Sequence, residues 1–185
     1  MIKKIADKVW KIDVDSNVYF LDLDDKIVID TGPRAHRSTV ELFLSKVIDF
    51  KKVNKVIFTH LHADHTGNFD LFPNAKFFAS KETIEDFKKD PAGSVLEPVL
   101  AAKLSLKLNE IEDFNGLKVI STPGHTRGSI CIWYEKEKVL FTGDTKFKYA
   151  YGRTDLPTSA PDKIEESIKK LGNYKYKVLA PGHDY

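Results

Sequence analysis

The sequence lacks the features that mark several classes of protein. It contains one cysteine, Cys131, so no disulfide framework within the chain is possible. No apolar run approaches the roughly 20 residues of a transmembrane helix. No continuous apolar stretch follows Lys3 and Lys4, so we expect no secretory signal. The net charge of +2 gives no reason to expect nucleic acid or a membrane as a partner. We therefore predict a cytoplasmic protein that acts on a small molecule.

The 185 residues, 42% of them hydrophobic, predict one domain spanning residues 1–185. Short β-branched runs predict strands over 8–12, 17–23, 26–29, 55–58, 76–79, 104–108, 117–121, 129–134, 139–141 and 177–179. Apolar periodicity and a capping serine predict helices over 38–50, 80–89 and 162–171. Residues 90–103, which contain Pro91 and Pro98, could form a loop or two short helices. This order predicts an α/β fold with helices outside the sheets.

Three of the six histidines fall within the stretch T-H-L-H-A-D-H-T-G. His60, His62, Asp64 and His65 form an H-x-H-x-D-H pattern, which chance would produce in about one such chain in two thousand. The pattern follows a predicted strand, where open α/β sheets place their sites. His60 and His62 should project to one side of an extended backbone. Asp64 and His65 are adjacent and should diverge, so one of them could serve a different metal from that of the first pair. A His-rich surface loop is the alternative interpretation.

Three further predicted strands each end in a glycine-containing turn followed by a residue that can bind metal. His125 follows in T-P-G-H-T, Asp144 in F-T-G-D-T and His183 in A-P-G-H. Four strands could therefore bring such side chains to one end of a sheet. Imidazole and carboxylate ligands without thiolate suit Zn²⁺, Fe or Mn²⁺.

Together these motifs resemble the metallo-β-lactamase superfamily. Details at 29–32 (I-D-T-G), 122–130 (T-P-G-H-T-R-G-S-I) and 152–157 (G-R-T-D-L-P) are most similar to its glyoxalase II-like branch. The resemblance runs from about Asn17 to His183. It implies an α/β fold of four layers, an αβ/βα sandwich with two mixed sheets face to face, helices outside and a metal site at one edge.

The resemblance also implies roles for the motif residues. His60, His62 and His125 would hold a first divalent ion, Asp64, His65 and His183 would hold a second, and Asp144 would bridge them. Two ions, Zn²⁺ in the first place and Fe or Mn²⁺ as alternatives, would activate a shared water. Asp64 and Asp144 would then be catalytic, with Asp64 also able to take a proton. Asp30 would orient a histidine ligand; a plain turn residue is the alternative.

Departures from the family pattern narrow the expected activity. In this sequence His183 lies two residues from the last position, and the helical domain that helps glyoxalase II hold glutathione does not follow. We therefore expect glutathione thioesters to be less favoured as substrates. We also expect the second metal to be loosely held, because terminal residues fray. The leading hypothesis is a binuclear hydrolase of thioesters or related acyl bonds.

Other functions stay open. A persulfide dioxygenase with one iron would use His60, His125 and Asp144. Phosphodiesterase, lactonase or β-lactamase activity is possible. The near-neutral net charge argues against a phosphodiesterase, and the expected lack of a secretory signal argues against a secreted β-lactamase. A binding module without catalytic activity is disfavoured, because all seven positions expected for metal ligands carry a His or Asp residue. An electron-transfer diiron protein is disfavoured because His62 stands where those proteins typically carry a carboxylate.

The remaining candidates have structural alternatives. We predict that Cys131 is a small core residue and that His36 is solvated or at a pocket rim. Arg153 and Asp155 are expected to pair and hold a loop. Four side chains could line the substrate pocket or pack a solvated loop: Lys146, Lys148, Tyr149 and Tyr151. The aromatic residues at 149–151 would also suit a contact in a dimer.

Overall fold

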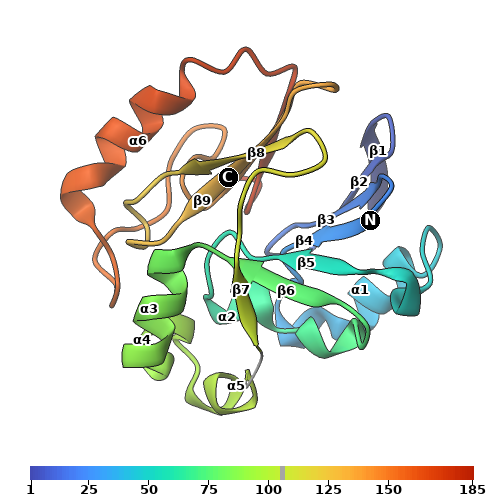
Figure 1. Ribbon diagram of the computed structural model, residues 1–185, viewed down its shortest axis with the longest axis horizontal. Coiled ribbons are helices and arrows are strands. Elements are labelled where there is room, and N and C mark those ends of the chain that lie inside the picture. Colours follow the sequence, from blue (N-terminus) through green and yellow to red (C-terminus); the bar gives the residue numbers. More distant parts are fainter. Residues whose placement is uncertain (105–106) are drawn as a thin grey trace.

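Two β-sheets pack face to face in the computed structural model, which describes residues 1–104 and 107–185 (Figure 1). The strands of the first sheet, in spatial order, are β1 (Ile2–Ala6), β2 (Val9–Ile12), β3 (Val18–Asp22), β4 (Lys26–Ile29), β5 (Lys55–Ile57), β6 (Lys76–Ala79) and β7 (Leu108–Glu110). Those of the second sheet are β11 (Val178–Pro181), β10 (Val139–Gly143), β9 (Ile130–Tyr134) and β8 (Leu117–Ser121).

Both sheets are mixed. In the first sheet, β1 to β4 pair antiparallel and β4 to β7 pair parallel. In the second sheet, β9 runs antiparallel to β8 and β10, and β11 runs parallel to β10. Strands β8, β10 and β11 therefore point the same way, so their carboxyl ends lie at one edge.

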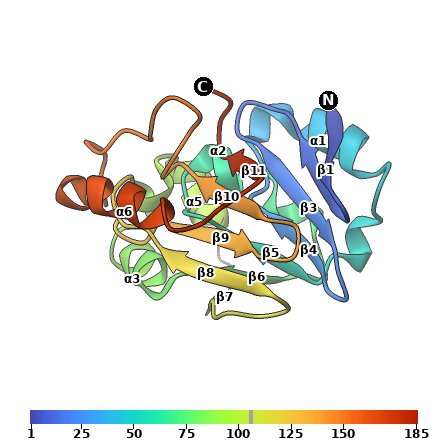
Figure 2. The ribbon, with the colours of Figure 1, turned by 90° about the horizontal axis from the view of Figure 1, so that it is seen from above.

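Helices cover the outer faces of the two sheets. The helices are α1 (Arg37–Leu44), α2 (Ala63–Thr66), α3 (Lys81–Lys89), α4 (Pro91–Val95), α5 (Pro98–Lys103) and α6 (Ile164–Leu171). Helix α6 lies outside the second sheet, and α1 and α2 lie on the far side of the first (Figures 1 and 2). The expected four-layer αβ/βα sandwich is confirmed. No helix within the described residues is both long and apolar enough to cross a membrane.

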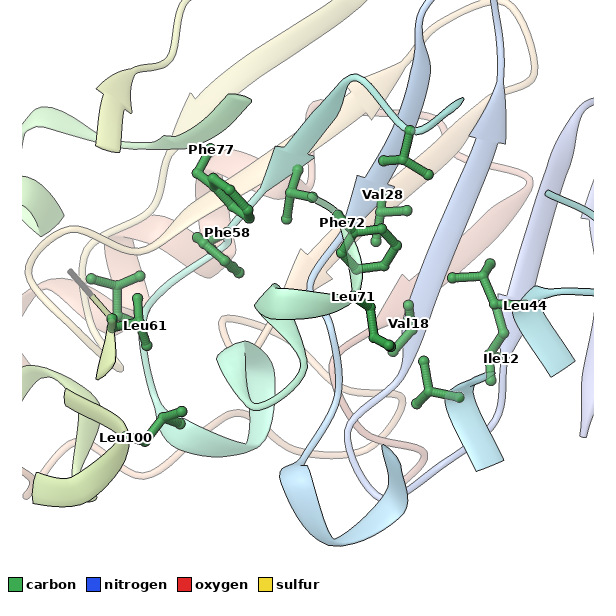
Figure 3. Packing of buried hydrophobic residues seen from close by; sticks show 14 of the residues in the cluster. Ile12, Val18, Val28, Leu44, Phe58, Leu61, Leu71, Phe72, Phe77 and Leu100 are labelled. Carbon is green, nitrogen blue, oxygen red and sulfur yellow. The ribbon is translucent and has the colours of Figure 1, made fainter. Parts of the chain in front are cut away.

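The alternation of side chains along β3 separates two layers of the core. Val18 and Phe20 face the helices, whereas Tyr19 and Leu21 face the second sheet. Figure 3 shows the cluster of the core that faces the helices. In this cluster the ring of Phe58 stacks on that of Phe77, with ring centroids 6.0 Å apart. All four of these β3 side chains are nearly inaccessible to solvent, so β3 is held on both faces.

A third apolar cluster joins the second sheet to α6. Cys131 and Leu140 pack there against Leu171 of the helix. Cys131 is fully buried, which confirms the prediction of a core residue. Burial raises the pKa of its thiol to about 11, so the group stays protonated at neutral pH.

The helix predicted over 38–50 is wrong in length. Helix α1 ends at Leu44, and the chain then forms turns in which the amides of Val47 and Ile48 both donate to the Leu44 carbonyl. Val47 and Ile48 still pack against the helix-side core. The periodic apolar residues therefore continue beyond the end of the helix, which is why they predict a helix that is too long.

Prolines begin two of the helices. Pro91 lies in the first turn of α4 and Pro98 in the first turn of α5, where a missing N–H costs nothing. The side chains of Asp90 and Glu97 cap these helices by accepting backbone N–H bonds. Of the two possibilities for 90–103, the pair of short helices is confirmed.

Two strand predictions also need correction. The expected strand over 104–108 lies partly outside the described residues, and the observed β7 begins only at Leu108. Leu104 instead caps the carboxyl end of α5, whose hydrogen-bonding continues to that residue. Strand β1 was not expected because Lys3 and Lys4 interrupt its apolar pattern. It forms because its backbone pairs with β2 at the edge of the sheet.

Candidate metal centre

The residues of the H-x-H-x-D-H pattern meet the later motif residues at one edge of the sandwich. They come from the loop after β5, from α2 with its N-cap, and from the loops after β8, β10 and β11: His60, His62, Asp64, His65, His125, Asp144 and His183. Since β8, β10 and β11 point the same way, their carboxyl ends deliver three of these residues together. The amide of Ile130 donates to the Thr59 carbonyl (3.0 Å), which ties this edge to the first sheet.

Three histidines form the first cluster. Nε2 of His125 lies 3.2 Å from Nε2 of His60 and 2.9 Å from Nδ1 of His62. All three rings are buried. Burial lowers the pKa of each, to about 3 for His62, because the charged form is poorly solvated. Neutral imidazoles with converging lone pairs are the form that binds a metal.

Asp64, His65 and His183 form the second cluster. Oδ2 of Asp64 lies 3.5 Å from Nε2 of His65 and 3.2 Å from Nε2 of His183. Asp144 lies between the clusters, with Oδ1 3.2 Å from Nε2 of His65 and Oδ2 3.6 Å from Nε2 of His125. The Asp144 carboxylate therefore contacts both groups, as a bridging residue must.

The carboxylates make the second cluster electrostatically different from the first. Burial lowers the pKa of His183, but hydrogen bonds to Asp144 and Asp64 outweigh it and raise the value to about 10. The pKa of His65 is likewise raised well above its usual value, against burial, mainly by Asp64 and Asp144. Burial favours protonated Asp64, yet His65 and His183 hold its pKa at about 2. Without a metal, the second cluster is therefore a set of ion pairs.

Hydrogen bonds at the other ring nitrogen orient four of these histidines. The Nδ1 groups lie within 3.1 Å of an oxygen in each case: Thr59 Oγ1 for His60, Asp30 Oδ2 for His65, the Arg153 carbonyl for His125 and the Asp15 carbonyl for His183. Nε2 of each ring is thereby directed toward the centre. The sequence could not identify the carbonyl groups of Arg153 and Asp15 as hydrogen-bond partners of the histidines, because every residue has a carbonyl group.

Asp30 has the position expected for an orienting carboxylate. Its Oδ1 accepts from the Thr59 amide, and its Oδ2 accepts from Thr59 Oγ1 and from Nδ1 of His65, all within 2.9 Å. Its backbone has a φ of +54°, a conformation that Asp tolerates better than most residues. The contact of Asp30 with a candidate ligand is therefore as predicted.

The site also holds His183 firmly. Its ring is buried and stacks on Tyr185 with centroids 5.0 Å apart. Asn17 donates from Nδ2 to the Pro181 carbonyl and to Asp184, and Lys11 pairs with Asp184. These contacts oppose the fraying expected for this segment.

The donor set fits a divalent metal. Nε2 of His65 and Oδ1 of Asp144 are buried and lie 3.2 Å apart, yet neither makes a hydrogen bond of good geometry with the other or with any other described residue. Such groups normally have one in folded proteins, and a metal ion in contact with both would supply it. Imidazole and carboxylate donors without thiolate match Zn²⁺, Fe or Mn²⁺.

Glycine allows the close approach of two loops to this centre. A Cβ atom on Gly182 would overlap Oδ1 of Asp144 and come within 2.8 Å of the His65 ring. One on Gly152 would lie 2.5 Å from the Asp144 carbonyl and 2.7 Å from Nδ1 of His125. Side chains at either position would therefore displace candidate ligands.

A cavity of about 360 Å³ opens onto the histidines and carboxylates. Of the four side chains weighed as pocket residues, Tyr151 lines it, whereas Lys146, Lys148 and Tyr149 are not among its lining residues. Arg153, expected to hold a loop, also lines it. Arg153 pairs with Asp155 through two hydrogen bonds of 2.8 Å, as predicted. A larger hollow of about 780 Å³, beside Trp133 and Tyr174, lies at the start of β8, the end remote from the histidines.

Comparison with known proteins decides the family. Residues 12–183 match the metallo-β-lactamase superfamily. The chain belongs to this superfamily. It is 34% identical over 91% of its length to "Probable metallo-hydrolase MJ0888" of Methanocaldococcus jannaschii, covering 87% of that protein. It is 26% identical over 72% of its length to the hydroxyacylglutathione hydrolase of Francisella tularensis subsp. novicida, covering 50% of that protein. The second of these relatives supports the resemblance to the glyoxalase II-like branch.

The fold is shared with a protein of solved structure. The protein TTHA1623, solved in a di-iron-bound form, superposes with a TM-score of 0.73 at 21% identity, over 92% of this chain and 88% of that one. The chain is therefore a member of a metallo-hydrolase family with a cluster of residues able to bind metal.

Proposed function

We propose that this protein is a binuclear metal-dependent hydrolase that cleaves thioesters or closely related acyl bonds. The observation that carries the proposal is the pair of three-residue clusters that meet at Asp144. His60, His62 and His125 would hold one ion, and Asp64, His65 and His183 would hold the other. Asp144 would contact both. Two ions bound there would lower the pKa of a water and polarise the carbonyl oxygen of the substrate.

The chain's own residues would position this water and take its proton. The side chain of Asp64 is 35% exposed and lines the cavity, so it can reach a substrate while contacting His183. Its low pKa keeps it ionised as an acceptor at neutral pH. Asp30 would keep Nε2 of His65 directed at the centre, and the Arg153 carbonyl would do the same for His125.

The reaction needs no nucleophilic side chain. A bond forms between the water oxygen and the acyl carbon, the carbon–sulfur bond breaks, and the departing thiolate receives a proton. Cys131 is too buried and too weakly acidic to serve as a nucleophile. Support for a thioester comes from a relative named hydroxyacylglutathione hydrolase, since an acylglutathione is a thioester.

Elemental analysis of the purified protein, followed by thioester hydrolysis assays, tests the proposal. We expect about two equivalents of zinc, iron or manganese per chain and release of thiol from an acyl thioester. His62→Ala and Asp144→Ala should lose this activity and bound metal while keeping the native far-UV circular dichroism. His36→Ala is the matched control, because His36 belongs to none of the metal-binding clusters.

One equivalent of iron, together with oxygen uptake on a persulfide, would replace the hydrolase with the mononuclear dioxygenase. Full activity of Asp144→Ala on the thioester would remove the bridging role.

A further inference from the structure

The cavity at the candidate metal centre is lined by apolar side chains as well as by metal-binding groups. We define the apolar wall as Leu96, Phe147, Tyr151, Leu156 and Tyr185, all of which line the cavity. They come from the junction of α4 and α5, from the loop after β10 and from the segment after β11. Three segments distant in sequence thus place apolar side chains at one opening.

Three of the five wall residues are exposed to solvent. In the described part of the chain, eight large hydrophobic side chains are exposed, and Leu96, Tyr151 and Tyr185 are three of them. Leu96 is 39% exposed and Tyr151 50%. Apolar side chains that gather at one opening, rather than scatter over the surface, mark a place where a ligand is bound.

The wall has a rigid base. Phe147 is 3% exposed, and its ring meets those of Tyr185 and His183 edge-on, with centroids 5.3 Å and 5.7 Å away. Tyr185 in turn stacks on His183. The apolar surface therefore continues directly from a candidate metal ligand, next to the place where the acyl carbon would react.

Cationic groups to bind a charged substrate are scarce in this cavity. Arg153 is the only Lys or Arg among the lining residues within the described part of the chain, and two of its N–H groups already donate to Asp155. The nearby lysines after Asp144 are not among the lining residues. The volume of about 360 Å³ is at the lower end for small-molecule sites. An anionic peptide such as glutathione would find little to pair with there.

We infer that the apolar wall binds the hydrocarbon acyl chain of the substrate, so that the enzyme acts on uncharged acyl thioesters and gains nothing from a glutathione moiety. This inference rests on the proposed function for the reaction. The binding surface itself is argued from the wall residues alone.

The test varies the acyl chain and the thiol separately, with metal-loaded protein. The probes are N-acetylcysteamine thioesters from acetyl to hexanoyl, and a matched pair of lactoyl thioesters of N-acetylcysteamine and glutathione. Each methylene that moves from water onto the wall should raise kcat/KM about fourfold. The two lactoyl thioesters should differ by less than about threefold. A flat or falling chain-length series, or a glutathione thioester preferred tenfold or more, would overturn the inference.

One substitution isolates the wall. Leu96→Asn keeps the size of the side chain and suits the left-handed backbone at this position, where φ is +63°. It should lower kcat/KM about tenfold more for the hexanoyl thioester than for the acetyl thioester. Leu42→Ala, at an exposed leucine on α1, is the control and should change neither. Equal losses on both thioesters would contradict a role for Leu96 in binding the chain.

A binding measurement separates this inference from the proposed reaction. Calorimetry with N-acetyl-N′-hexanoylethylenediamine, the non-hydrolysable amide analogue of the hexanoyl thioester, should show binding that Leu96→Asn weakens about tenfold. Such binding without hydrolysis of any thioester would support acyl-chain binding at the apolar wall and refute the proposed thioesterase activity. Hydrolysis without any dependence on Leu96 would support the thioesterase activity and refute acyl-chain binding at the wall.

Discussion

The two clusters of the candidate metal centre should bind their ions with different pH dependence. The first cluster consists of histidines whose pKa values are lowered by burial, so above pH 6.5 they are already neutral. The second contains His65 and His183, whose pKa values the surrounding carboxylates raise, to about 10 for His183. An ion entering the second cluster must therefore displace protons that an ion entering the first does not.

The size of the effect follows from the number of protons. Each proton that must leave a ligand with a pKa above the working pH changes the apparent affinity about tenfold per pH unit. Two such ligands give a limit of about a hundredfold per unit. The charge of an ion in the first cluster lowers both pKa values, so the slope between pH 6.5 and 8.5 should lie between about tenfold and a hundredfold. Affinity rises with pH, because deprotonation favours the metal-bound form.

Competition with a chromophoric zinc chelator at several pH values measures both slopes. The first ion should bind with nearly constant affinity between pH 6.5 and 8.5, and the second should weaken steeply as the pH falls. Calorimetry in two buffers with different ionisation enthalpies counts the protons released with each ion. Equal slopes for the two ions, or no proton release with the second, would refute the electrostatic division of the site.

Three substitutions test other parts of the structure. Asp30→Asn removes the carboxylate that accepts from Nδ1 of His65, so the affinity for the second ion should fall about 10- to 100-fold in the chelator assay; an unchanged affinity would leave Asp30 as a turn residue. Phe141→Ala removes a fully buried ring that packs edge-on against Tyr19, and should lower the free energy of unfolding in urea by about 3–5 kcal/mol; a loss below about 1 kcal/mol would show that the two sheets are not held together there. The sequence led us to expect that Arg153 and Asp155 hold a loop, but the structure leaves their ion pair open to water. Arg153→Ala also keeps the carbonyl that accepts from His125, so the melting temperature should stay nearly unchanged; a clear fall would restore the loop-holding role.

Helix and strand boundaries show where local patterns stop being informative. Capping located the start of α3, since Ser80 accepts from the Thr83 amide as the sequence predicts. Periodicity located α6, although this helix begins two residues later than expected and has no side-chain cap. The helix over 38–50 was too long, because Val47 and Ile48 bury the same face from turns as they would from a helix. Strand β1 was missed because backbone pairing at the edge of a sheet leaves little apolar pattern.

Motifs at strand ends predicted the chemistry of the site, and backbone atoms completed it. All seven candidate ligands were recognised in the sequence, since each is a His or Asp in a short glycine-containing context. The carbonyl groups that orient His125 and His183 were invisible there, because they belong to the main chain of residues far away.

The sequence alone determined the types of ligand, the family and the layered α/β class, because short-range spacing encodes strands, turns and metal-binding side chains. Only the tertiary structure decided which histidines are neutral and which are charged. That division depends on the carboxylates of Asp64 and Asp144 lying against His65 and His183 and on the burial of the first cluster. The apolar wall was likewise decided by folding, because its residues are contributed by three segments that become neighbours only when the two sheets pack together.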